Sequence, residues 1–165
     1  MVILYKQDIE NNKGLCLIDP HGDLVEDVLH IIPKERIKDV IYFNPDDIGY
    51  PTGINLLELT KGLGGEDAIR EKEFIAESII SLFHKIYTEK YSGPRMEYIL
   101  RNTIHTAFTI PDATLFTVYK LLINTKFRKS VVRHLKDENL LDFWKYEFAK
   151  AGDYQKVKMI SPITN

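Results

Sequence analysis

The stretch that decides the predicted fold is residues 15–24, LCLIDPHGDL. An apolar run ends there at an acid and turns through Pro20 and Gly22, a pattern typical of a buried strand that leads into a helix. At the carboxyl edge of an open α/β sheet, such a turn is where nucleotide phosphates and their metal usually bind. Asp19, His21 and Asp23 are therefore candidates for a position near a nucleotide or its metal.

The same residues also fit a simpler interpretation, in which Asp19 is a turn acid and Asp23 is the N-cap of the next helix. The phosphate-binding sequence G-x-x-x-x-G-K-[S/T] does not occur in the 165 residues. Lys129-Ser130 is the only Lys-Ser pair, and it lacks the glycine-rich approach whose backbone N–H groups bind phosphate. Any nucleotide site is therefore incomplete in this sequence, and both interpretations stay open.

Composition limits the classes of function. With 165 residues, 44% of them hydrophobic, the chain can bury a sizeable core as one domain or two small ones. A formal net charge of -2 argues against coating nucleic acid through bulk charge, so any DNA contact is expected to be local. Cys16 is the only cysteine, which excludes an internal disulfide and favours a reducing, cytoplasmic setting. No apolar stretch approaches the ~20 residues that span a bilayer.

The first 60 residues are predicted to be an α/β segment. Residues 1–12 suit the last turns of a helix, residues 15–19 a strand, residues 23–32 an amphipathic helix and residues 39–43 a second short strand. The order strand, helix, strand implies a right-handed parallel crossover. Because two parallel strands make only a marginal sheet, we expect this segment to be part of a larger one.

Residues 61–150 are predicted to be all-helical. Apolar residues recur at helical spacing over residues 66–91. A second long helix follows Pro94, a residue that suits a first helical turn. Three shorter helices are expected further on, the last of them N-capped by Asp137. The expected fold class is thus an α/β segment followed by an all-α domain, predominantly helical overall.

A basic segment in the helical part is a candidate contact surface for DNA. Lys126, Arg128, Lys129 and Arg133 lie close together in sequence around Phe127, and such cations can bind a phosphate backbone. The alternative is an ordinary solvated helix face.

No structural metal site is predicted. The five histidines include no pair at i, i+4, and none has a cysteine partner at zinc spacing. The chain also contains no G-x-S-x-G sequence of the kind that marks a serine nucleophile.

Residues 14–24 resemble the DPHG[D/E] segment of the hexameric DNA-pumping ATPases of the HerA/FtsK-like superfamily, particularly the type IV secretion and conjugative coupling ATPases. Residues 39–45 and 53–58 resemble the next strand and turn of those proteins. Their helical insert is similar to residues 93–102, 113–115 and 143–148.

This resemblance implies that residues 1–60 belong to a RecA-like P-loop sheet, that residues 61–150 form a helical insert facing DNA, and that residues 151–165 return toward the ATPase core. The Walker A and Walker B motifs would lie outside the chain. The resemblance thus implies a fragment of an ATP-driven DNA-translocating motor that does not hydrolyse ATP alone. ATP and Mg²⁺ would be cofactors of the full-length protein, with neither bound by this chain.

The implied partners are DNA, the other subunits of a hexameric ring, and the type IV secretion or conjugation machinery. The implied location is the cytoplasm, with any attachment to the inner face of the membrane supplied by regions outside this chain. The alternative function is a non-enzymatic helical adaptor that binds protein or DNA.

Overall fold

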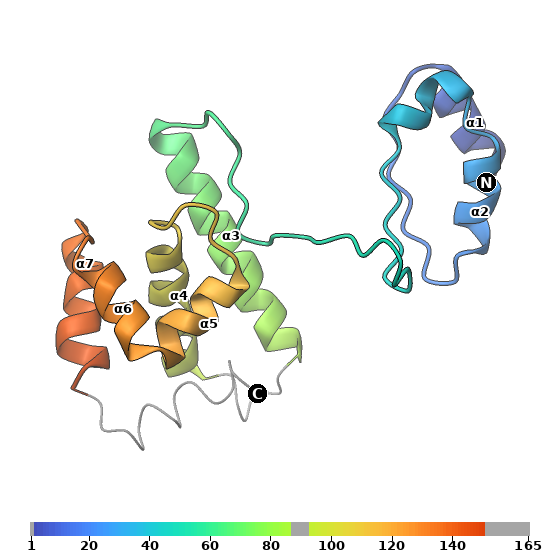
Figure 1. Ribbon diagram of the computed structural model, residues 1–165. Helices are drawn as coiled ribbons and strands as arrows, with labels where there is room; N and C mark the ends of the chain where they lie inside the picture. The colour runs from blue at the N-terminus through green and yellow to red at the C-terminus, as the bar shows by residue number, and fades with distance from the viewer. Residues whose placement is uncertain (1, 87–92, 151–165) are drawn as a thin grey trace. The chain divides into compact units, whose positions relative to one another are not determined.

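The computed structural model describes residues 2–86 and 93–150, which form helices joined by turns and extended segments (Figure 1). The chain divides into two units, Met1–Thr52 and Gly53–Asn165. No strand occurs in the described ranges. The α/β part of the expected fold class is therefore wrong, whereas the predominantly helical character is confirmed. The expected return segment, residues 151–165, lies outside the described residues.

The described residues of the first unit form three short helices: α1 (Val2–Glu10), α2 (Asp23–His30) and the 3₁₀-helix η1 (Lys34–Asp39). Helices α1 and α2 lie side by side (Figure 1). Their buried apolar residues are Ile9 and Val28. Arg36 of η1 donates hydrogen bonds from Nη1 to the carbonyl oxygens of Ile9 (2.9 Å) and Lys13 (3.3 Å). Arg36 therefore ties η1 to the end of α1 and to the turn that follows it.

The two segments predicted as strands are not paired. Within the described residues, neither 15–19 nor 40–43 forms a ladder of backbone hydrogen bonds with another segment, and Asp39 belongs to η1. Parallel strands are stable when both faces of their sheet are covered. Here the side chain of Ile18 is 86% exposed and that of Ile41 is 90% exposed. A short apolar run without a covering layer is insufficient for a sheet, so the predicted crossover is wrong.

The second unit is built around a buried central helix, α4 (Pro94–Ala107). Helices α3 (Gly65–Ile86) and α5 (Leu115–Ile123) both pack against α4. The helices that follow are α6 (Thr125–Val132), α7 (Glu138–Asp142) and the π-helix η2 (Phe143–Phe148). Leu100 and Ile104 of α4 are fully buried. The helices predicted in this part of the chain are confirmed within the described residues.

Local signals at two helix starts act as expected. Pro94 occupies the first turn of α4, where its missing N–H costs no hydrogen bond. The carboxylate of Asp137 accepts a hydrogen bond from Leu140 N at 3.1 Å and so caps α7. Before α3, Asn55 anchors the incoming loop by donating from Nδ2 to the carbonyl oxygen of Ala113 at 2.9 Å.

One of the two buried polar residues of α4, Thr106, is bonded to η2. Trp144 donates from Nε1 to Thr106 Oγ1 at 2.8 Å, and Thr106 donates from Oγ1 to the carbonyl oxygen of Asn102 at 2.8 Å. The Trp144 ring packs edge-on against Phe143 and Phe148, with centroid separations of 4.7 Å and 5.0 Å. A buried hydroxyl and indole are thus satisfied inside an otherwise apolar core.

Replacing Ile104 with Ala should lower the free energy of unfolding of the second unit by about 2–5 kcal/mol, because a fully buried side chain leaves a cavity. Urea unfolding followed by the emission of Trp144, the only tryptophan, measures this change. Ile69→Ala is the matched control, since Ile69 is 63% exposed, and it should change stability by less than about 0.5 kcal/mol. Equal losses in the two variants would contradict the burial of α4.

Candidate nucleic-acid interface

Asp19 organises the turn before α2. Its Oδ1 accepts a hydrogen bond from the backbone N–H of His21 at 3.1 Å, and its Oδ2 accepts from Leu24 N at 2.9 Å and Val25 N at 3.3 Å. The first N–H groups of a helix have no partner within that helix. The Asp19 carboxylate, which lies outside α2, is a hydrogen-bond partner for two of these N–H groups. The interpretation of Asp19 as a turn acid therefore describes its contacts.

The N-cap of α2 is Gly22, not Asp23 as predicted. Gly22 has a φ of 90°, a left-handed conformation that is strained for residues with a side chain. Asp23 is the first residue of the helix and is exposed. The prediction is wrong because the helix starts at the residue expected to cap it, and the capping carboxylate comes from Asp19, four residues upstream.

Desolvation raises the pKa of the Asp19 carboxyl, but backbone hydrogen bonds from His21, Val25, Leu24 and Gly22 outweigh it and hold that pKa below its ordinary value. Both oxygens of the Asp19 carboxylate accept these backbone hydrogen bonds. Across residues 2–86 and 93–150, no three His, Cys, Asp or Glu side chains are grouped so that they could hold a metal ion. A position of Asp19, His21 and Asp23 near a nucleotide or its metal stays a prediction.

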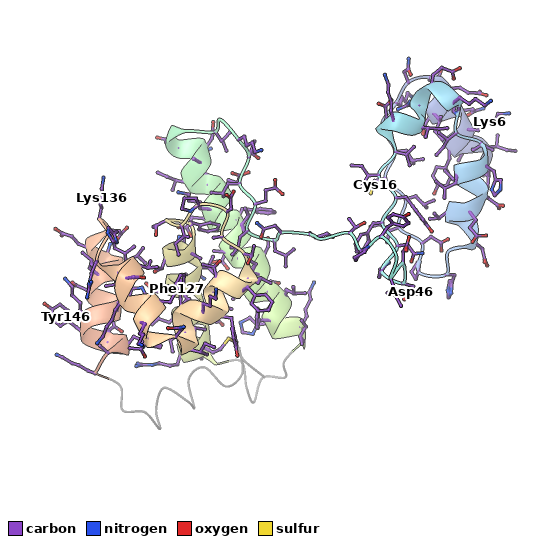
Figure 2. The ribbon with its side chains drawn as sticks, viewed as in Figure 1. Lys6, Cys16, Asp46, Phe127, Lys136 and Tyr146 are labelled. Carbon is purple, nitrogen blue, oxygen red and sulfur yellow. The ribbon has the colours of Figure 1, made fainter. Side chains whose placement is uncertain are left out.

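Three of the four predicted DNA-contact residues share one outer face of α6. Lys126, Lys129 and Arg133 are spaced three and four residues apart, which places them on one side of a helix, and all three are exposed. We call them the α6 basic face. Asn124 caps this helix by accepting a hydrogen bond from Phe127 N at 3.0 Å. Lys136 follows the helix, and Figure 2 shows its side chain extending away from the ribbon.

The fourth predicted residue, Arg128, lies on the opposite side of α6 and packs inward. Its Nη1 donates to the carbonyl oxygens of Leu121 and Leu122, at 2.9 Å each, and its Nη2 donates to Thr125 Oγ1 at 3.1 Å. The guanidinium lies 4.9 Å from the centroid of the Phe148 ring. Arg128 thus caps the end of α5 and stacks on η2 (Phe143–Phe148).

Burial lowers the pKa of Arg128 from its ordinary value. The sequence carries a signal for this placement: helical spacing puts Arg128 on the same side of α6 as Phe127, Val131 and Val132, which are all partly buried. Arg128 is close in sequence to the residues of the α6 basic face, but its position in the helical turn places it on a different side of α6.

Charge is distributed unevenly over the second unit. Residues 113–136 contain six Lys or Arg and no Asp or Glu, whereas α3 contains five Asp or Glu against three Lys or Arg. Two acids of α3 face nitrogen donors of α4: Arg101 Nη1 lies 2.6 Å from Glu77 Oε1, and His105 Nε2 lies 3.5 Å from Glu73 Oε1. The hydrogen bond from Arg101 lowers the pKa of Glu77. Arg101 and His105 are thus engaged within the unit.

Comparison of the chain with models of protein families, with curated proteins and with solved structures found no match. Within residues 2–86 and 93–150, no helix has the length and apolar character needed to cross a membrane.

Asp19→Asn should speed hydrogen exchange at the amides of Leu24 and Val25, because the uncharged carboxamide is a weaker acceptor. The depressed pKa also fixes the direction of the pH effect. Protection from Asp19 is full above the unfolded pKa of about 3.9 and is lost as pH falls through the lower folded value. NMR exchange rates measure both effects. Asp23→Asn is the control and should leave both amides protected; equal effects of the two variants would contradict the capping role.

Arg128→Ala should lower the free energy of unfolding of the second unit by about 2–3 kcal/mol, because the carbonyl groups of Leu121 and Leu122 lose a charged donor. Arg133→Ala removes an exposed arginine at the C-cap of the same helix and should cost less than about 0.5 kcal/mol. Urea unfolding monitored at Trp144 compares the two. An Arg128 variant as stable as the Arg133 variant would show that these contacts contribute little.

Proposed function

We propose that the second unit contacts the phosphate backbone of DNA through the α6 basic face, as a module of an ATP-driven DNA-translocating motor of the type IV secretion and conjugation class. The observation that supports the DNA contact is the placement of three exposed cations on one side of α6, within a run that contains no acid. Their charge is available to an external anion without repulsion from neighbouring carboxylates in sequence.

The dimensions of this face suit a nucleic-acid backbone. From Lys126 to Arg133 the helix advances by about 10 Å, at 1.5 Å per residue. Each strand of B-DNA carries one phosphate per about 3.4 Å of the DNA axis, so long and flexible Lys and Arg side chains on this face can reach neighbouring phosphates. Contacts of this kind position a protein on DNA without reading its sequence. The expected binding is therefore insensitive to sequence and dependent on salt.

The motor assignment is supported by the resemblance of residues 14–24 to the DPHG[D/E] segment. Under this proposal Asp19 orders the turn after α1, while ATP and Mg²⁺ bind through residues supplied elsewhere in the full-length protein. The other subunits of the ring and the secretion machinery are partners of the same proposal. An intact P-loop encoded directly upstream in the reading frame would favour the motor, and a stop codon there would favour a non-enzymatic adaptor.

Replacing all three of Lys126, Lys129 and Arg133 with Gln should reduce the affinity of the chain for a 30-base-pair DNA duplex at low salt. It should also reduce the slope of log affinity against log salt by up to about 3, because each lost phosphate contact contributes about 0.9. Fluorescence anisotropy over a salt series measures both quantities.

The matched control replaces Lys61, Arg70 and Lys85 with Gln, which changes net charge equally at other exposed positions of the second unit. Its affinity and salt slope should match those of the unaltered chain. Binding that does not depend on salt, no binding at low salt, or equal losses in the two triple variants would each contradict the proposed DNA contact.

A further inference from the structure

Helix α5 is apolar on two sides. Its inner side chains are buried against the core: Val118, Leu121 and Leu122. Its outer side chains are exposed: Phe116 by 76%, Tyr119 by 38% and Ile123 by 46%. Only Thr117 and Lys120 interrupt the apolar sequence of the helix. A helix that is apolar all round is normally buried on every side, so the outer side of α5 has the composition of an interface.

The outer residues form one continuous strip. Phe116, Tyr119 and Ile123 are spaced three and four residues apart, so they lie on one side of α5, and we call them the α5 stripe. The stripe extends over about 10 Å of helix axis, or two turns. The rings of Phe116 and Tyr119 meet edge to face, with centroids 6.3 Å apart and an interplanar angle of 71°.

This geometry is that of an anchor for a partner helix. Aromatic side chains provide a large apolar contact area and dominate the binding energy of many interfaces. Ring contact between Phe116 and Tyr119 restricts both side chains before any partner arrives, which reduces the entropy lost on binding. Two helical turns match the length over which an amphipathic helix presents anchors at i, i+4 and i+7.

The charge beside the stripe defines the partner further. Lys120 adjoins the stripe on the side of α5 that faces α6, and its Nζ lies 5.7 Å from the centroid of the Phe127 ring. Lys126 follows on α6, and no Asp or Glu occurs from residue 113 to residue 136. A basic partner would be repelled here, whereas an acidic one would be attracted and steered toward the stripe.

We propose that the α5 stripe binds one amphipathic helix of a partner protein, with apolar anchors at i, i+4 and i+7 and acidic residues flanking them. Phe116 and Tyr119 contact the anchors, and Lys120 pairs with a flanking carboxylate. This surface differs from the α6 basic face in relying on apolar burial, which makes its binding less sensitive to salt.

A displayed library of 18-residue helices tests the proposal. Leu is fixed at i, i+4 and i+7, the flanking positions are randomised, and the full chain is the bait. Selected peptides should be enriched in Asp and Glu at the flanks. Their affinity, measured by anisotropy, should fall at least tenfold for Phe116→Ser and at least threefold for Lys120→Glu. A peptide with Lys at the flanks should bind Lys120→Glu better than it binds the unaltered chain.

Phe74→Ser is the matched control, because Phe74 is an aromatic residue of α3 that is 72% exposed; peptide affinity should stay within twofold. Unchanged Trp144 emission verifies that each variant is folded.

Failure to enrich any helix, enrichment of basic or neutral flanks, or undiminished binding to Phe116→Ser would overturn the proposal. Self-association that Phe116→Ser abolishes would overturn it in favour of a second copy. If Phe116→Ser lost its affinity for the DNA duplex, the stripe would be a nucleic-acid contact and the proposal would be overturned. If only the triple variant of the α6 basic face lost that affinity, the result would support the DNA contact of α6 and leave the α5 stripe to the peptide measurements.

Discussion

The arrangement of the second unit depends on the inward guanidinium of Arg128. It donates to two carbonyl oxygens at the end of α5, bonds to Thr125 at the start of its own helix, and stacks on the Phe148 ring of η2. The neighbouring ring of Trp144, 5.9 Å from the guanidinium, is hydrogen-bonded in turn to Thr106 of α4. One charged group therefore connects three helical segments directly and α4 through an indole. Charge-assisted bonds to otherwise unsatisfied carbonyls explain why an arginine is stable at a half-buried position.

This constraint also determines which side chains face outward. With Arg128 turned inward, helical spacing directs Lys126, Lys129 and Arg133 to the opposite side of α6. Only Asn124 separates α5 from α6; it ends one helix and caps the other. A cationic face and an apolar stripe are thus carried by successive helices of one unit. The two surfaces favour different ligands, because one relies on ionic contacts and the other on apolar burial.

The first unit shows where local sequence signals were insufficient. Residues 15–19 have the composition of a strand, but a strand also needs a neighbour to accept and donate its backbone hydrogen bonds. The described residues provide none, and Ile18 stays exposed. The turn that follows was correctly placed before a helix. Its capping carboxylate could not be assigned from spacing, because Asp19 reaches α2 through a left-handed glycine, Gly22, which only the folded backbone reveals.

The sequence by itself determined the helices of the second unit, the start of α4 at Pro94, the cap of α7 at Asp137 and the cluster of cations around α6. These depend on periodicity and on contacts between residues close in sequence, which short-range physics governs. Only the tertiary structure decided that Arg128 bonds to the end of α5 and stacks on Phe148, and that the outer side of α5 is exposed. Both outcomes depend on which helices pack together, and that is set by the combined burial of residues far apart in the chain.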